Sequence, residues 1–199
     1  GQVDKLMLNT MIDKTAVAYY SVSLTLAGAI SIIPQALIEG FRPDILSFRN
    51  TDMEKYRRRL MQLYGLVFWL CTAYCLFTTF FAKYIILVLY GEKYLPAVGS
   101  LSLIVWYTSF SYFGAINNIY MVAENKIKWV QVTTFVGAIV NVILNYVFIP
   151  MFGVEGAALA SLITQIITNF ALLAIIPQLR ENFIIIVRGI TFNGMINKK

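Results

Sequence analysis

Histidine is absent from the 199-residue sequence, and cysteine occurs only twice. The lack of histidine excludes His-dependent catalysis and most zinc chemistry from this chain, because imidazole is a common general base and metal ligand. Cys71 and Cys75 stand four positions apart in one apolar stretch, so they share one face of a helix. Two cysteines at that spacing form neither a disulfide framework nor a complete metal site. We expect both thiols to pack between helices.

Charged residues are also scarce. They make up 13% of the chain, against about a quarter in soluble domains, while hydrophobic residues make up 59% and the mean hydropathy is +0.71. Long stretches without Asp, Glu, Lys or Arg cover residues 15–38, 60–82, 94–123, 129–154 and 156–179. A helix needs about 20 mostly apolar residues to cross a hydrocarbon core. The sequence therefore predicts an all-α, polytopic membrane helical bundle with five full transmembrane helices.

The two ends of the sequence differ from these five stretches. Residues 1–12 predict a sixth, partial transmembrane helix, and the sequence begins at Gly1 without a signal-peptide pattern. We therefore expect the C-terminal part of a longer polytopic protein. We assign residues 1–179 to a transmembrane bundle and residues 180–199 to a cytoplasmic or interfacial tail.

Catalytic motifs are missing as well. The sequence contains no Walker A loop, no GxSxG elbow and no carboxylate pair beside a nucleophile. With most of the chain assigned to membrane helices, no room remains in it for a separate catalytic domain. We expect a protein that is not an enzyme and that holds no cofactor or metal.

The basic residues alternate between connections. Net charge is +6, but a nucleic-acid interface is not indicated, because the charges cluster between the apolar stretches. The basic clusters are Arg42, Arg49, Lys55, Arg57, Arg58 and Arg59; Lys126 and Lys128; and Arg180, Arg188, Lys198 and Lys199. The alternate connections hold only Lys14, Lys83 and Lys93. The positive-inside rule then places residues 42–59, 124–128 and the C-terminus in the cytoplasm, and the connections near 13, 83–95 and 150–155 outside.

Local signals predict how the apolar stretches begin, bend and end. The segment IPMFGVEGAALA, residues 149–160, predicts a hairpin in which Pro150 ends one helix and Gly153 allows the turn. Pro34 lies inside the second stretch and predicts a kink there, either as packing or as a hinge. Thr51 or Asp52 is expected to cap the helix that follows.

Polar side chains inside the apolar stretches are the candidate functional residues. Asn141 and Asn145 are one helical turn apart, and Gln165 and Asn169 repeat that spacing in the next stretch. Such amides either join two helices or line a hydrated cavity, which would suit a ligand rich in hydroxyl groups. The neighbours Asp4 and Lys5 are either a functional site in the membrane or a pair that reaches the interface from a helix end.

The order of these segments resembles a known family. QVDKLML, AVAYYSVS and IIPQALIEGFRPDI resemble the start of the second bundle of O-antigen and polysaccharide flippases. GEKYLPAVGSLSLIVWYTSF, NNIYMVAENK and GAIVNVILNYVFIPMFGVEGAALASLITQ continue the resemblance, which covers about residues 1–175. These flippases belong to the multidrug/oligosaccharidyl-lipid/polysaccharide exporter superfamily. The resemblance implies two six-helix bundles, twelve helices in all, with this chain as the C-terminal bundle from a partial helix seven to helix twelve.

The resemblance further implies a transporter of the bacterial inner membrane. Its substrate would be undecaprenyl-diphosphate-linked oligosaccharide, an O-antigen or capsule repeat unit, moved by alternating access without a bound cofactor. Asp4 would take part in proton or sodium coupling. Polysaccharide polymerase and chain-length proteins are candidate partners beside the membrane lipid. The candidate cavity residues are the cations Lys5 and Arg42 and the amides Asn117, Asn118, Asn141, Asn145, Gln165 and Asn169.

Four alternatives remain open on the sequence. A drug or metabolite antiporter of the same superfamily should show an acidic cation site deep in a bundle. A flippase for the peptidoglycan lipid precursor should line its cavity with more cations. A non-transporting membrane subunit, or a membrane-embedded glycosyl- or acyl-transferase, comes from another class; the transferase should carry acidic or histidine residues in long loops, and the loops here are short.

Overall fold

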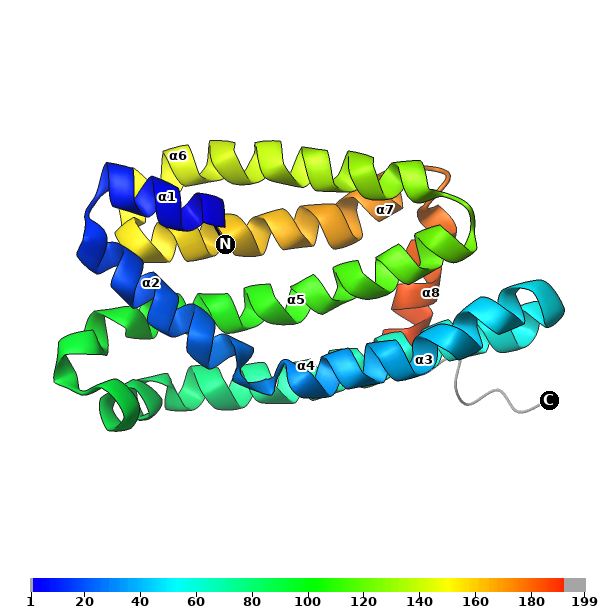
Figure 1. The fold of residues 1–199 in the computed structure, drawn as a ribbon, viewed down its shortest axis with the longest axis horizontal. Coiled ribbons are helices and arrows are strands. Elements are labelled where there is room, and N and C mark those ends of the chain that lie inside the picture. The colour runs from blue at the N-terminus through cyan, green and yellow to red at the C-terminus, as the bar shows by residue number, and fades with distance from the viewer. Residues whose placement is uncertain (1, 192–199) are drawn as a thin grey trace.

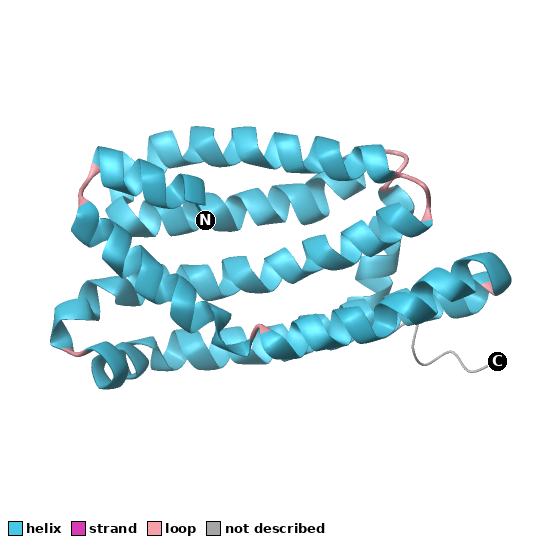
Figure 2. Ribbon diagram, viewed as in Figure 1, coloured by secondary structure: helices cyan, strands magenta, loops and turns pink. Residues whose placement is uncertain are grey.

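The computed structural model describes residues 2–191, which are almost entirely helical and contain no strand (Figures 1 and 2). This confirms the prediction of an all-α helical bundle. Two short 3-10 helices and one π-turn interrupt the longer helices. The elements are α1 (Gln2–Met11), α2 (Lys14–Ala27), η1 (Gly28–Ile30), α3 (Ile32–Thr51), α4 (Met53–Tyr90), η2 (Glu92–Ala97), α5 (Val98–Ala123), α6 (Ile127–Ile166), η3 (Ile167–Ala171), α7 (Leu172–Ile175) and α8 (Arg180–Ile190).

In the described part of the chain, two helical segments are long and apolar enough to cross a membrane. These are α4 and the continuous stretch Ile127–Ile175, and the bent pair α2–η1 and α3 is a third if it forms one span. Five full spans were expected from the sequence. The stretch Ile127–Ile175 contains two of them, because it reverses direction at Gly153. In α5, Ser, Thr and Asn side chains are spread among the apolar residues.

The reversal at Gly153 confirms the hairpin predicted from IPMFGVEGAALA, but Pro150 does not end the helix as expected: it lies inside α6, which continues to Gly153. Gly153 has φ 60° and ψ −129°, a conformation that strongly favours glycine. The two limbs of α6 on either side of it run back along each other in Figure 1. A Cβ atom added at Gly156 would collide with the carbonyl of Phe148, and Ala157 is fully buried. Small residues therefore let the two limbs approach closely.

The kink expected at Pro34 is also present. The chain bends by 50° between α2–η1 and α3, and Pro34 lies in the first turn of α3. Proline lacks the N–H that would bond the carbonyl four residues earlier, so the helix is broken just before it. At the other end of α3, Asp52 rather than Thr51 caps α4, and its Oδ1 accepts from the Lys55 N–H at 3.1 Å. Local sequence signals therefore located both features.

The connections fall at two ends of the bundle, in the alternation that the basic clusters predict (Figure 1). The α3–α4 and α5–α6 connections lie at one end, which we call the basic end, and α1–α2, η2 and Gly153 lie at the other. Ion pairs join separate helices at the basic end, including Arg49 Nε to Glu124 Oε1 at 2.7 Å and Arg57 to Glu181 at 2.6 Å. Which side of the membrane each end faces stays a prediction.

Helix α8 belongs to the expected tail segment, and it runs across the basic end rather than along the bundle (Figure 1). It packs on α4: a Cβ atom added at Gly189 would meet the Met61 carbonyl oxygen at 2.6 Å. Asn182, Ile185 and Ile186 are buried in this contact. The boundary at residue 179 remains a prediction, and the remainder of the expected tail, residues 192–199, lies outside the described residues.

Candidate functional site

A cavity of about 420 Å³ lies among α1, α5, α6 and η3. Most of its wall is polar but uncharged. It is lined by Asp4, Tyr107, Ser111, Gly114, Ala115, Asn117, Asn118, Met121, Thr133, Thr134, Gly137, Asn141, Ser161, Thr164, Gln165, Thr168 and Asn169. Among the described lining residues Asp4 carries the only charge, so the wall offers amides and hydroxyls to a ligand but no cation.

Glycines in two of the cavity helices let polar side chains approach closely. A Cβ atom at Gly114 would stand 3.0 Å from Asn169 Oδ1, and one at Gly137 would stand 2.9 Å from the Thr168 methyl group. Both distances are shorter than ordinary van der Waals contact. Glycine at position 114 therefore leaves space for the Asn169 side chain, and glycine at position 137 leaves space for the Thr168 side chain.

The Asp4 carboxylate is held at the cavity wall by two neutral donors. It is 1% exposed; its Oδ2 accepts from the Tyr20 hydroxyl at 3.0 Å, and its Oδ1 accepts from Asn145 Nδ2 at 2.8 Å. A buried carboxylate is costly unless hydrogen bonds replace its hydration, and hydrogen bonds to a charged acceptor are the stronger kind. The donors therefore allow a carboxylate to be buried among α1, α2 and α6.

The same network extends across the hairpin of α6. Asn145 Nδ2 also donates to Asn141 Oδ1 at 3.2 Å, and Asn141 Nδ2 contacts Ser161 Oγ at 3.2 Å. Asn145 Oδ1 is buried without a hydrogen-bond partner among the residues that the structure describes. A buried acceptor without a donor costs free energy. The network around Asp4 therefore has a vacant acceptor directly beside a carboxylate.

A second buried network connects the cavity to the basic end. Tyr64 donates its hydroxyl hydrogen to Asn117 Oδ1 at 2.7 Å, and Asn182 Nδ2 donates to the same oxygen at 2.9 Å. Asn169, on the π-turn η3, donates to Gln165 Oε1 at 2.6 Å. π-turns inside α-helices occur often at functional sites. The Asn117 amide of α5 is thus oriented by α4 and α8, and the Asn169 amide of η3 is oriented by Gln165 of α6.

The structure brings most of the predicted site residues together. Asp4 and the amides Asn117, Asn118, Asn141, Gln165 and Asn169 line the cavity, while Asn145 lies behind the wall, fully buried against Asp4. Both interpretations of the amides hold at once, because Asn141 lines the cavity and also joins the two limbs of α6. Whether these residues bind substrate stays a prediction.

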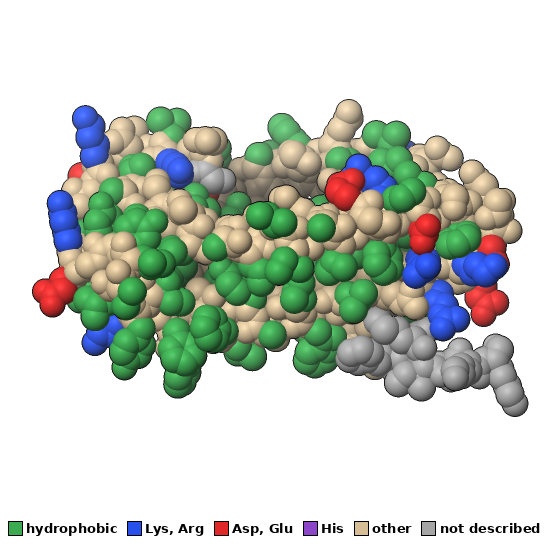
Figure 3. All heavy atoms as spheres, turned by 60° about the horizontal axis from the view of Figure 1, so that its bottom comes forward, with side chains coloured by type: hydrophobic (Ala, Val, Ile, Leu, Met, Phe, Trp, Pro, Cys, Tyr) green, Lys and Arg blue, Asp and Glu red, His purple; other side chains and the backbone are tan. Residues whose placement is uncertain are grey.

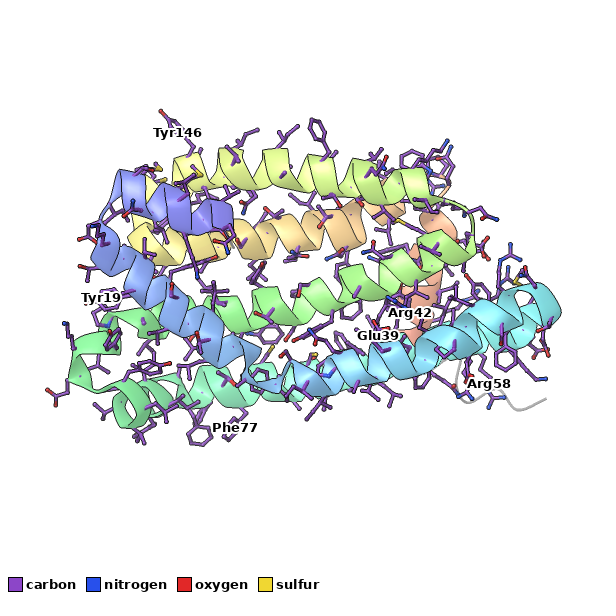
Figure 4. All side chains as sticks on the ribbon, viewed as in Figure 1. Tyr19, Glu39, Arg42, Arg58, Phe77 and Tyr146 are labelled. Carbon is purple, nitrogen blue, oxygen red and sulfur yellow. The ribbon has the colours of Figure 1, made fainter. Side chains whose placement is uncertain are left out.

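The two predicted cations lie apart from this wall. Lys5 is half-buried on α1 and does not line the cavity. Arg42 pairs with Glu39 at 3.3 Å on the side of α3 toward α5 (Figure 4), and it lines a separate cavity of about 180 Å³. Asn118 lines both cavities, so the Arg42 cavity and the larger one meet at this amide.

Sequence reasoning missed three residues of the networks: Tyr20, Tyr64 and Asn182. The tyrosines gave no signal, because aromatic side chains are common in apolar helices of this composition. Asn182 could have been found, since Asn182, Ile185, Ile186 and Gly189 recur at helical spacing within RENFIIIVRGI. That period indicates a helix with one face packed on the bundle.

The fold and this cavity define a class: a helical membrane bundle with a polar interior site. Over 179 residues the chain is 26% identical to a protein of Haloferax volcanii named "Probable flippase AglR". The similarity covers 88% of this chain but 38% of that relative, so the chain spans well under half of the relative's length. No family model matches the chain, and no solved structure matches it. The name of that relative describes a flippase, which is a transporter rather than an enzyme.

Proposed function

We propose that this chain forms the C-terminal bundle of a flippase that moves lipid-linked oligosaccharide across a membrane. The observation that carries the proposal is the 420 Å³ cavity, whose described wall holds amides and hydroxyls and a single charged side chain. The similarity to the probable flippase AglR supports the same role from sequence. The finer assignment follows the resemblance: an undecaprenyl-diphosphate-linked O-antigen or capsule repeat unit in the bacterial inner membrane, moved by alternating access between two bundles.

The chemistry of the wall suits the sugar part of such a substrate. Each sugar hydroxyl both donates and accepts a hydrogen bond, and amides and hydroxyls on the protein match both roles. Asn118 and Thr134 are exposed on the wall and form no hydrogen bond with another described residue, so their polar atoms are available to a ligand. Asn117, Asn141 and Asn169 are already oriented by their protein partners.

The diphosphate part of the substrate requires cations that this wall lacks. Arg42 meets that need in the adjoining cavity, because guanidinium binds phosphate oxygens well and Asn118 connects the two cavities. Lys5 follows Asp4 on α1, where its long side chain can extend toward either the cavity or the membrane interface. In the proposed function sugars occupy the neutral cavity while phosphates stay near its Arg42 side.

Asp4 would couple transport to a cation. A proton on its carboxylate, or a sodium ion beside it, would alter the hydrogen bonds from Tyr20 and Asn145 that join α1, α2 and α6. The vacant Asn145 Oδ1 provides an acceptor for such a cation. Cation occupancy and helix arrangement would thereby be linked, as alternating access requires.

A cation-coupled drug or metabolite antiporter is the second candidate. The acidic site that distinguishes such an antiporter was not evident in the sequence, but Asp4 is buried at the cavity wall. The shortage of cations on this wall counts against the peptidoglycan-precursor flippase. Export of small organic cations, with no translocation of lipid-linked oligosaccharide, would favour the antiporter.

The test is translocation by the complete protein in proteoliposomes. The doubly substituted Asn118→Ala/Thr134→Val protein should move lipid-linked oligosaccharide roughly tenfold more slowly or worse, because two hydrogen bonds of about 1 kcal/mol each are removed. Gln131→Ala is the matched control, since Gln131 is an exposed amide on α6 outside the cavity wall. Equal rates for the two variants would contradict the proposed role of the cavity.

A further inference from the structure

The outer face of α4 changes from cationic to apolar along its length. Lys55, Arg58, Arg59 and Gln62 follow one another at helical spacing and, with Phe48 of α3, line a cavity of about 380 Å³. The same face then continues with exposed apolar side chains: Leu66, Trp69, Leu76, Phe77 and Phe80. Arg58 and Phe77 extend from the same side of α4 in Figure 4.

Charge in this cavity is not fully compensated by the residues that the structure describes. Lys55 pairs with Asp52 at 3.1 Å and Arg59 pairs with Asp44 at 3.2 Å. Arg58 is exposed and forms no ion pair among the described residues. Within the described part of the chain, the cavity therefore presents one guanidinium without an acidic partner beside two solvent-accessible cations, a combination that favours an anion with several oxygen acceptors.

The apolar part of the face has the dimensions of a lipid chain. Leu66 and Phe80 are separated by about 21 Å along the helix at 1.5 Å per residue, which covers the roughly 15 Å depth of one leaflet. Trp69 is 48% exposed and Phe80 is 80% exposed. Figure 3 shows many apolar side chains along the middle of the molecule, with Lys and Arg side chains toward its two ends.

We infer that this face of α4 is a binding site for an anionic phospholipid, separate from the cavity of the proposed function. The phosphate of the headgroup lies in the cavity of Lys55, Arg58 and Arg59, and an acyl chain lies along Leu66, Trp69 and Phe80. A soluble phosphate would use only the cationic part of the face. The continuous apolar track is the feature that selects a lipid.

The test measures lipid binding to the complete protein by native mass spectrometry in detergent. The probes are phosphatidylglycerol, phosphatidylcholine with the same acyl chains, and glycerol 3-phosphate as the soluble headgroup. We expect phosphatidylglycerol to bind best, and Lys55→Gln/Arg58→Gln to weaken its binding roughly 30-fold, because each basic residue near an anionic lipid contributes about 1 kcal/mol. Phe80→Ser should weaken phosphatidylglycerol binding without affecting glycerol 3-phosphate.

Lys128→Gln is the control, since Lys128 is an exposed cation at the same end of the bundle but on α6. An equal loss in this variant would overturn the inference, because it would indicate general surface charge. Equal binding of phosphatidylcholine would overturn the role of the cations. Competition by glycerol 3-phosphate at the same concentration as the lipid would overturn the role of the apolar track. Translocation assays do not enter this test, so its failure is distinct from failure of the proposed flippase.

Discussion

Asn145 Nδ2 on α6 donates a hydrogen bond to Asp4 Oδ1 on α1 over 2.8 Å, with both side chains buried. The two residues are 141 positions apart in the chain. This contact ties the first helix to the hairpin at the far end of the sequence, and it places a carboxylate at the cavity wall. The same hydrogen bond therefore holds two helices together and holds the carboxylate that is proposed to couple transport to a cation.

Substitution of Asp4 tests the coupling role. Asp4→Asn keeps the volume of the side chain but removes its charge, so Tyr20 loses a charge-assisted acceptor worth about 1.5–3 kcal/mol. We expect transport by the complete protein to fall roughly tenfold or more and to lose its dependence on the coupling cation. The measurement is uptake into proteoliposomes under imposed proton or sodium gradients. Glu92→Gln, an exposed carboxylate on η2, is the control, and unchanged cation dependence in Asp4→Asn would refute the role.

Substitution of Gly114 tests the shape of the cavity. Gly114→Ala places a methyl group against the Asn169 amide, so Asn169 must shift and disturb its bond to Gln165. We expect weaker oligosaccharide binding by the complete protein with a loss of stability of about 1–3 kcal/mol. Gly40→Ala is the matched control on α3, because nothing lies within 4 Å of an added Cβ there. Ligand titration and thermal unfolding of both variants would measure the two effects, and identical binding would count against the assigned wall.

The hairpin glycines predict a graded loss of stability. Gly153→Ala forces a side chain into a positive-φ conformation and should cost on the order of 1–3 kcal/mol. Gly156→Ala should cost more, because its methyl group collides with backbone atoms of Phe148 that cannot rotate away. Thermal unfolding in detergent measures both. A smaller loss for Gly156→Ala than for Gly153→Ala would contradict the close approach of the two limbs.

The cap of α4 predicts a dependence of stability on pH. The Asp52 carboxylate accepts hydrogen bonds from the Lys55 backbone N–H, which has the larger effect, and from the Lys55 side chain. Both lower the pKa of that carboxyl from its usual 3.8. Because the pKa is lower in the folded state, Asp52 contributes its stability above the unfolded pKa and loses it as pH falls through the folded pKa. Asp52→Asn retains a capping side chain without titrating. Thermal unfolding between about pH 2 and 6 should show a smaller acid-induced decline in Asp52→Asn than in the wild type.

Local signals predicted much of the fold. Gly153, Pro34 and Asp52 act through their own backbone conformation or through a neighbour a few residues away, and the sequence therefore located the hairpin, the bend and the cap. The alternation of basic clusters likewise matched the two ends of the bundle. The length of an apolar stretch did not show which helices are continuous: the helical stretch Ile127–Ile175 passes through the turn at Gly153.

The site was predicted as a list of residues but not as an arrangement. Polarity within apolar stretches was enough to select Asp4, Asn141 and Asn145, because such groups are costly in lipid. It could not show that Arg42 faces another cavity, nor that Asn182 reaches Tyr64, since both depend on how distant helices pack. A single sequence does not show how segments far apart in the chain pack against each other.

The proposed function requires that the cavity lie on the path of the transported oligosaccharide. The most direct measurement is labelling of Thr134→Cys in the complete protein by a membrane-impermeant thiol reagent, with and without lipid-linked oligosaccharide. Cys71 and Cys75 are buried, and Gln131→Cys provides an exposed reference on the same helix outside the wall. If the cavity lies on this path, substrate slows labelling at position 134 and leaves labelling at position 131 unchanged. Equal labelling at position 134 with and without substrate would contradict it.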